Sequence, residues 1–168
     1  MMRLEAMAVT IPHTGHHPNR MDFAGVLTVV NVVSDSAPAG ARGHRVLLTR
    51  RAAELALPSL LGMAVDYRPM WDGHDARRKI GLLTEAHLEG EQLMVRGYLY
   101  RRDFPEIAKA ISAQAPHALG MSYELADASV EDTSARIWKL IRVTFTGAAI
   151  LLREKAAYKA TSFRLAGI

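Results

Sequence analysis

A histidine and a serine stand in the two segments of this sequence that are best suited to chemistry. His74 lies in segment 71–75 (WDGHD), shortly before a strand-like apolar run, and Ser122 lies inside the apolar segment 118–125. An imidazole that removes the proton of a serine hydroxyl converts the serine into a nucleophile. The pair therefore indicates acyl transfer.

Each of these residues also has a plain structural interpretation. Ser122 could be a small buried residue whose hydroxyl bonds to backbone, and His74 could be a surface histidine in an acidic loop. Two other histidines are weaker candidates for the base. His117 precedes Ser122 by an odd number of residues, which places the two on opposite faces of a strand. His87 lies between Glu85 and Glu89 at a strand end, where we expect it to be exposed.

Composition limits the class of protein. The chain has 168 residues, 49% hydrophobic and 23% charged, which is typical of one soluble globular domain. The absence of cysteine excludes disulfides, thiolate metal sites and a cysteine nucleophile. A net charge of +4, spread over short arginine clusters and accompanied by few aromatic residues, argues against a specific nucleic-acid surface. Neither a membrane-spanning run nor a signal peptide is evident.

Segment patterns predict the elements that position the pair. Residues 1–20 are expected to form a flexible arm, whose three histidines lack the acidic or thiol partners of a metal site. Residues 21–160 are expected to form the domain, and 161–168 a loose tail. The predicted strands and helices span 23–33, 45–49, 50–57, 80–87, 92–100, 118–125, 136–146 and 153–159, and a further helix begins at 103.

Three local signals mark where some of these elements begin or end. Thr49 is a suitable N-cap for the first helix. Asp103 and Glu106 form a capping-box pattern with Pro105 in the first turn. Residues 88–91 predict a hairpin turn between two strands. Because strands and helices do not alternate regularly, the pattern predicts an α+β fold with a mainly antiparallel, barrel-like core and a few short flanking helices.

The order of these segments resembles the prohead (head maturation) proteases of tailed phages, whose fold is that of the herpesvirus assemblin. The resemblance covers roughly residues 25–160. It rests on His74-Asp75 before Ile80-Gly81, the strand 93–97 (LMVRG), the helix from Asp103, the segment 119–122 (LGMS) and the strand 141–146 (IRVTFT). His74 and Ser122 are 48 residues apart (122 − 74).

The resemblance implies a triad of Ser122, His74 and a third residue on the following strand. Counting 24 residues on from Ser122 leads to Thr146, which can accept a hydrogen bond but carries no charge. Three arrangements stay open. The site could work as a dyad supported by Thr146, it could recruit Glu124 or a loop acid such as Asp127 or Asp132, or it could be weak or inactive.

The resemblance also implies a function. We expect a serine endopeptidase that cleaves the major capsid and scaffold proteins inside the immature phage head in the host cytoplasm, without cofactor or metal and as a homo-oligomer. The alternative is a protease-fold protein with little turnover that serves as a structural or scaffolding part of the capsid. An esterase is a distant third possibility, because the Gly-x-Ser-x-Gly nucleophile elbow is absent around Ser122.

Overall fold

The longest strand of the protein, β8 (Ile137–Leu152), organises the fold. Its partner along one edge is β7 (Leu119–Val130), which runs antiparallel to it. Along the other edge, two short strands follow one another parallel to it: β3 (Arg45–Leu48) and then β4 (Ala64–Tyr67). Strand β8 therefore joins parts of the chain that are far apart in sequence.

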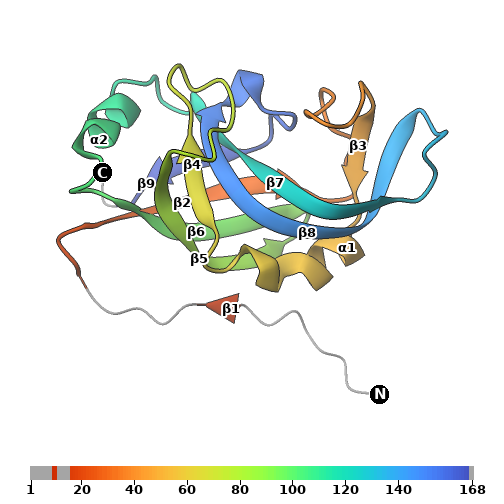
Figure 1. Ribbon diagram of the computed structural model, residues 1–168, viewed down its shortest axis with the longest axis horizontal. Coiled ribbons are helices and arrows are strands. Elements are labelled where there is room, and N and C mark those ends of the chain that lie inside the picture. Colours follow the sequence, from red (N-terminus) through yellow and green to blue (C-terminus); the bar gives the residue numbers. More distant parts are fainter. Residues whose placement is uncertain (1–8, 11–15, 167–168) are drawn as a thin grey trace.

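The sheet continues from β4 through four further strands to a free edge. Its order is β3-β8-β4-β5-β6-β2-β9, with β1 on β5 and β7 on β8. Because β7 also packs against β2 and β9, the mixed sheet curls into a half-barrel (Figure 1). The remaining elements are β1 (Val9–Thr10), β2 (Arg20–Val29), α1 (Arg50–Ala56), the 3₁₀ helix η1 (Leu57–Leu60), β5 (Lys79–Glu89), β6 (Gln92–Tyr100), α2 (Pro105–Ser112), the 3₁₀ helix η2 (Arg153–Lys155) and β9 (Ser162–Leu165).

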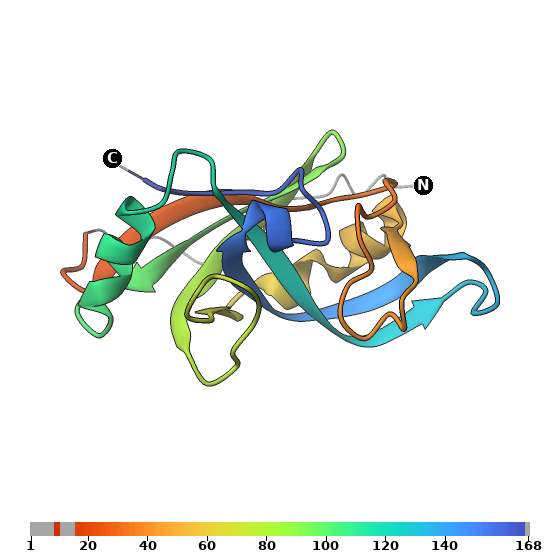
Figure 2. The same ribbon diagram turned by 90° about the horizontal axis from the view of Figure 1, so that it is seen from above.

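This computed structural model describes residues 9–10 and 16–166. The α+β, barrel-like fold predicted from the sequence is confirmed, with helix α2 at one end and the β7–β8 turn at the other (Figure 2). Most of the predicted flexible arm lies outside the described residues.

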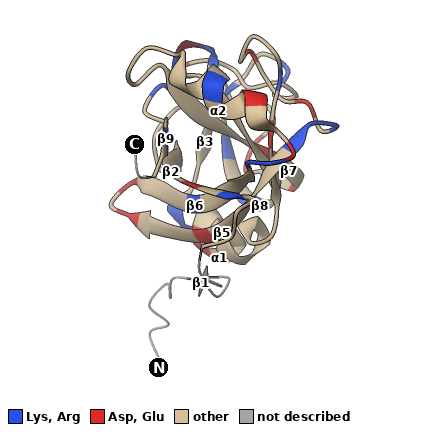
Figure 3. Cartoon of the chain, turned by 90° about the vertical axis from the view of Figure 1, so that its left-hand side faces the viewer, with Lys and Arg blue, Asp and Glu red and all other residues tan. Residues whose placement is uncertain are grey.

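No helix in the described ranges is long and apolar enough to cross a membrane. Basic and acidic residues are interspersed on the face shown in Figure 3.

Alternation along β7 separates the barrel interior from the surface that carries the serine. Met121 is 1% exposed and faces β2, where a Cβ on Gly25 would lie 2.8 Å from its sulfur. Tyr123 also points inward and packs edge-on against the buried ring of Phe145. Because side chains alternate along a strand, Ser122 projects to the opposite face.

Two local predictions at the chain's turns have different outcomes. The Thr49 hydroxyl accepts a hydrogen bond from the Ala52 amide, so the predicted cap of α1 is confirmed. The capping box at α2 was wrong: Phe104 is the N-cap, and no side chain caps the helix. The Asp103 carboxylate instead accepts a hydrogen bond from Asn19 Nδ2 at 2.7 Å, because the start of β2 lies beside it.

The C-terminal segment also differs from its prediction as a loose tail. Its residues 162–165 form β9 and pair with residues 23–26 of β2. Four residues are too few to display a strand pattern of their own, so their conformation depends on the partner strand.

Candidate active site

The sheet register places the candidate nucleophile and a buried carboxylate in one row across three strands. Ser122 of β7 pairs with Ala149 of β8, and Ala149 pairs with Asp66 of β4. Side chains opposite one another in neighbouring strands project from the same face. Glu124, two residues after Ser122, projects from that face as well. The result is a surface with Ser122 and Glu124 on one strand and Asp66 two strands away.

Small residues on β8 leave this surface free for a large side chain. Ala149 lies between Ser122 and Asp66 and has only a methyl group. Glu124 pairs with Gly147, where an added Cβ would lie 3.2 Å from Glu124 Oε2 and 3.3 Å from the Ala64 carbonyl oxygen. The carboxylate of Glu124 therefore occupies space that a side chain at position 147 would restrict.

The connection between β4 and β5 carries His74 over this surface. It is attached to the barrel through Trp71, which is buried, packs against Tyr67 with ring centroids 5.1 Å apart, and accepts a hydrogen bond from the Leu152 amide at 2.8 Å. Asp66 Oδ1 accepts a second one from the Asp75 amide at 3.0 Å. These contacts on either side of His74 fix the position of its backbone.

The imidazole of His74 lies between the serine and the carboxylates. Its Nε2 is 3.0 Å from Ser122 Oγ, a hydrogen-bonding distance. Its Nδ1 is 2.9 Å from Glu124 Oε1 and 3.7 Å from Asp66 Oδ1. The Nδ1–Glu124 contact is short, but the carboxylate lies away from the N–H direction, so the contact is electrostatic rather than a well-aligned hydrogen bond.

Thr146 does not belong to the group of side chains around His74. The pairing of β7 with β8 passes from Glu124–Gly147 to Leu125–Phe145, so Thr146 is the extra residue of a β-bulge. Its side chain is exposed, and no hydrogen bond among the described residues joins it to His74. The predicted contact between Thr146 and His74 is therefore absent.

Among the described residues, none of the other acids considered from the sequence contacts the imidazole. Asp132 accepts hydrogen bonds from the amide and hydroxyl of Ser134, which hold the pKa of its carboxyl below the usual value, and Asp127 is exposed. The Asp75 carboxylate accepts a hydrogen bond from the Arg77 amide, and this bond lowers its pKa. Of the alternatives left open by the sequence, Glu124 is the one whose carboxylate contacts His74.

A signal for Glu124 was present in the sequence. A serine and a glutamate two positions apart on a strand share a face, and that spacing needs no knowledge of the neighbouring strands. Asp66 was missed for a different reason: its approach to His74 depends on the parallel pairing of β4 with β8, which local sequence patterns do not reveal.

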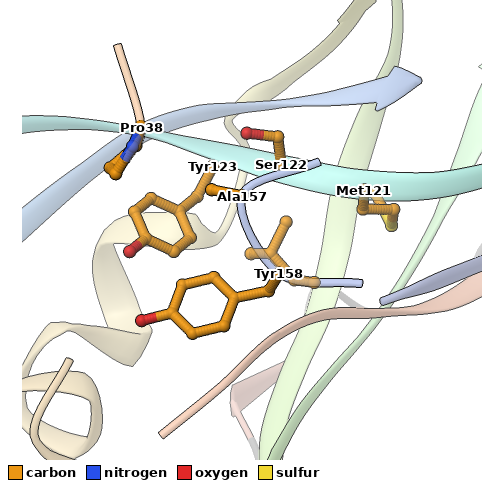
Figure 4. Close-up of a pocket in the computed structure, with 7 residues that line it drawn as sticks. Pro38, Met121, Ser122, Tyr123, Ala157 and Tyr158 are labelled. Atoms are coloured by element: carbon orange, nitrogen blue, oxygen red, sulfur yellow. The ribbon is translucent and has the colours of Figure 1, made fainter. Parts of the chain in front are cut away.

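A small pocket adjoins β7, and Leu27, Met121 and Ser122 are among the residues that line it. Pro38, Ala157 and the rings of Tyr123 and Tyr158 contribute to it (Figure 4). The Tyr158 hydroxyl donates a hydrogen bond to the Val46 carbonyl oxygen at 3.2 Å. Burial raises the pKa of Tyr158 to about 12 and raises that of Tyr123 as well, so both phenols are neutral over the ordinary pH range.

One group of possible metal-ligating side chains occurs in the described part of the chain, and it consists of Asp66, His74 and Glu124, with ligand atoms within 4.8 Å of one another. Because Nε2 of the same ring faces a serine hydroxyl, we interpret this group as the surroundings of a proton-accepting imidazole. An uncharged His74 flanked by carboxylates at Nδ1 is expected to carry its proton there, which leaves Nε2 free to accept one.

Sequence comparisons give no match: no family model and no curated protein matches this chain. Solved structures match in fold. The capsid assembly protease gp21 of bacteriophage T4 has a TM-score of 0.55 at 16% identity, over 84% of this chain and 88% of that chain. The KSHV protease, solved with a hexapeptide phosphonate inhibitor, has a TM-score of 0.53 at 12% identity, over 88% of this chain and 66% of that chain. The chain has the assemblin-like protease fold predicted from its sequence.

Proposed function

We propose that this chain, with its assemblin-like protease fold, is a serine endopeptidase of phage head maturation in which Ser122 is the nucleophile, His74 the general base and Glu124 the residue that orients the imidazole. One observation carries the proposal: His74 Nε2 lies 3.0 Å from Ser122 Oγ while Glu124 Oε1 lies 2.9 Å from Nδ1 of the same ring. Nucleophile, base and orienting carboxylate are thus in the order that a catalytic triad requires.

The chemistry follows from this geometry. Ser122 Oγ attacks the scissile carbonyl carbon as its proton passes to His74 Nε2. The imidazolium then donates that proton to the leaving amine, and the acyl group remains on Ser122 as an ester. A water molecule, deprotonated by Nε2, hydrolyses the ester, and the proton returns to Ser122 Oγ. The negative charge of Glu124 stabilises the imidazolium that forms in both halves of the cycle.

The context of capsid assembly is also a proposal. It is supported by the fold shared with the T4 capsid assembly protease and by the sequence resemblance to prohead proteases. The expected substrates are the major capsid and scaffold proteins, and the expected site of action is the interior of the prohead. The alternative of an inactive structural protein was motivated by the uncharged Thr146. The contact between Glu124 and His74 removes that motivation.

The test is to incubate the purified protein with the capsid and scaffold proteins encoded beside its gene. Wild type should cleave them, and Ser122→Ala should not. Ser129→Ala is the matched control, because Ser129 lies on the same strand outside the site. Cleavage that persists in Ser122→Ala would refute the assignment of the nucleophile. In parallel, a fluorophosphonate probe should label Ser122 only when His74 is intact, and labelling without His74 would contradict the role of the base.

A further inference from the structure

Asp66 is the most deeply buried acidic side chain at the candidate active site. Its side chain is 5% exposed, compared with 32% for Glu124. A carboxylate that loses its hydration is stable only where charges or hydrogen-bond donors replace the water. Asp66 therefore needs partners inside the protein, and their identity indicates what it does.

Two partners are present, and both belong to the loop that carries the base. Asp66 Oδ1 accepts a hydrogen bond from the Asp75 amide at 3.0 Å and lies 3.7 Å from His74 Nδ1. Among the described residues, no lysine or arginine forms an ion pair with Asp66. In the described part of the chain, the cationic partner of this buried carboxylate is thus the imidazole in its protonated form.

We propose that Asp66 is a second positioning residue for His74. It holds the loop through the Asp75 amide, and its charge adds to that of Glu124 in stabilising the imidazolium. The two carboxylates are the ionisable side chains that contact the ring, Asp66 from β4 and Glu124 from β7. The proposal rests on the function proposed above, because stabilising the imidazolium matters to a base that takes up a proton in each cycle.

The test separates the charge of Asp66 from its hydrogen bond. Asp66→Asn keeps an oxygen for the Asp75 amide but removes the charge. In the Ser122→Ala background, the acid–base titration of His74, followed by the NMR signal of its Cε1–H, should move to lower pH by about one pH unit. In the active protein, the rate constant for fluorophosphonate labelling of Ser122 should fall roughly tenfold, and the acid limb of its pH profile should move in the same direction.

Asp72→Asn is the matched control. Asp72 lies on the same loop, but its carboxylate pairs with Arg68 at 3.8 Å and does not contact the imidazole. This variant should leave both the NMR titration and the labelling unchanged. If Asp66→Asn does not fold, Asp66→Ala, which removes the charge with a smaller side chain, is measured in the same way.

The outcomes separate this inference from the proposed function. An unchanged His74 titration in a folded Asp66 variant would overturn the positioning role even if the wild type cleaves its substrates. An equal shift of the His74 titration in Asp72→Asn would also overturn the positioning role, because the effect would then be a general response to lost charge. Absence of labelling in the wild type would count against the proposed function, whereas the NMR titration would still decide whether Asp66 acts on His74.

Discussion

The contact between Glu124 and His74 gives the sharpest prediction for catalysis. Glu124→Gln keeps the size of the side chain but removes its charge. At a separation of 2.9 Å, attraction between a carboxylate and an imidazolium is about 6 kcal/mol at an effective dielectric constant of 20 and about 1.4 kcal/mol in water. Glu124 is 32% exposed, so solvent screens part of this attraction and the real value lies between these limits.

We take a loss of about 3 to 4 kcal/mol in transition-state stabilisation, which corresponds to roughly a 10²- to 10³-fold lower kcat. The change should appear in kcat rather than in KM, because the positive charge that Glu124 stabilises develops on the imidazole as it takes up the serine proton. The assay is single-turnover cleavage of a fluorogenic peptide that contains a junction from the capsid or scaffold protein. Circular dichroism and thermal unfolding establish that the variant is folded.

Thr146→Val is the matched control for this experiment. Thr146 is exposed on the bulge of β8, so its replacement should change kcat less than about threefold. Activity of Glu124→Gln within threefold of wild type would refute the orienting role of Glu124. A loss in Thr146→Val as large as that in Glu124→Gln would restore the original assignment of Thr146.

Two further predictions concern the surroundings of the site. Gly147→Ala should lower kcat at least several-fold with a small change in Tm, because the new Cβ would lie 3.2 Å from Glu124 Oε2 and displace the carboxylate; wild-type kcat in this variant would contradict that reasoning. Burial raises the pKa of Tyr158 to about 12, above the value of about 10 in an unfolded chain. The contribution of Tyr158 to stability should therefore be constant below about pH 10 and fall by roughly 2 to 3 kcal/mol between pH 10 and 12, because the unfolded state loses this proton first. Tyr123, whose pKa burial also raises, adds to the fall. Tyr158→Phe should make this fall shallower in urea unfolding measured across that range, and an equal slope would show that Tyr158 is not responsible.

Much of the fold could be predicted because its signals are local. The hairpin of β5 and β6 follows from alternating residues around a short turn, and the start of α1 follows from the hydroxyl of Thr49. The short distance between His74 and Ser122 could be anticipated only through the family resemblance, because 48 residues separate them in the chain.

The parts of the fold and of the site that could not be predicted depend on pairings between distant strands. Counting along the chain led to Thr146, because the count could not include a bulge that turns this residue away from the site. The position of Asp66 likewise depends on the pairing of β4 with β8, and the conformation of β9 depends on its pairing with β2. For the same reason, Asp103 accepts a hydrogen bond from Asn19 and does not cap α2.

The central position of β8 has a consequence for protein synthesis. His74 and Asp66 leave the ribosome well before Ser122, but the strands that carry Asp66 and Ser122 both pair with β8, which ends at Leu152. A chain still being translated through β8 therefore lacks the strand that brings base and nucleophile together. If the chain is a protease, its own synthesis delays the appearance of activity until nearly the whole domain has been made, so a growing chain does not cleave itself before β8 is complete.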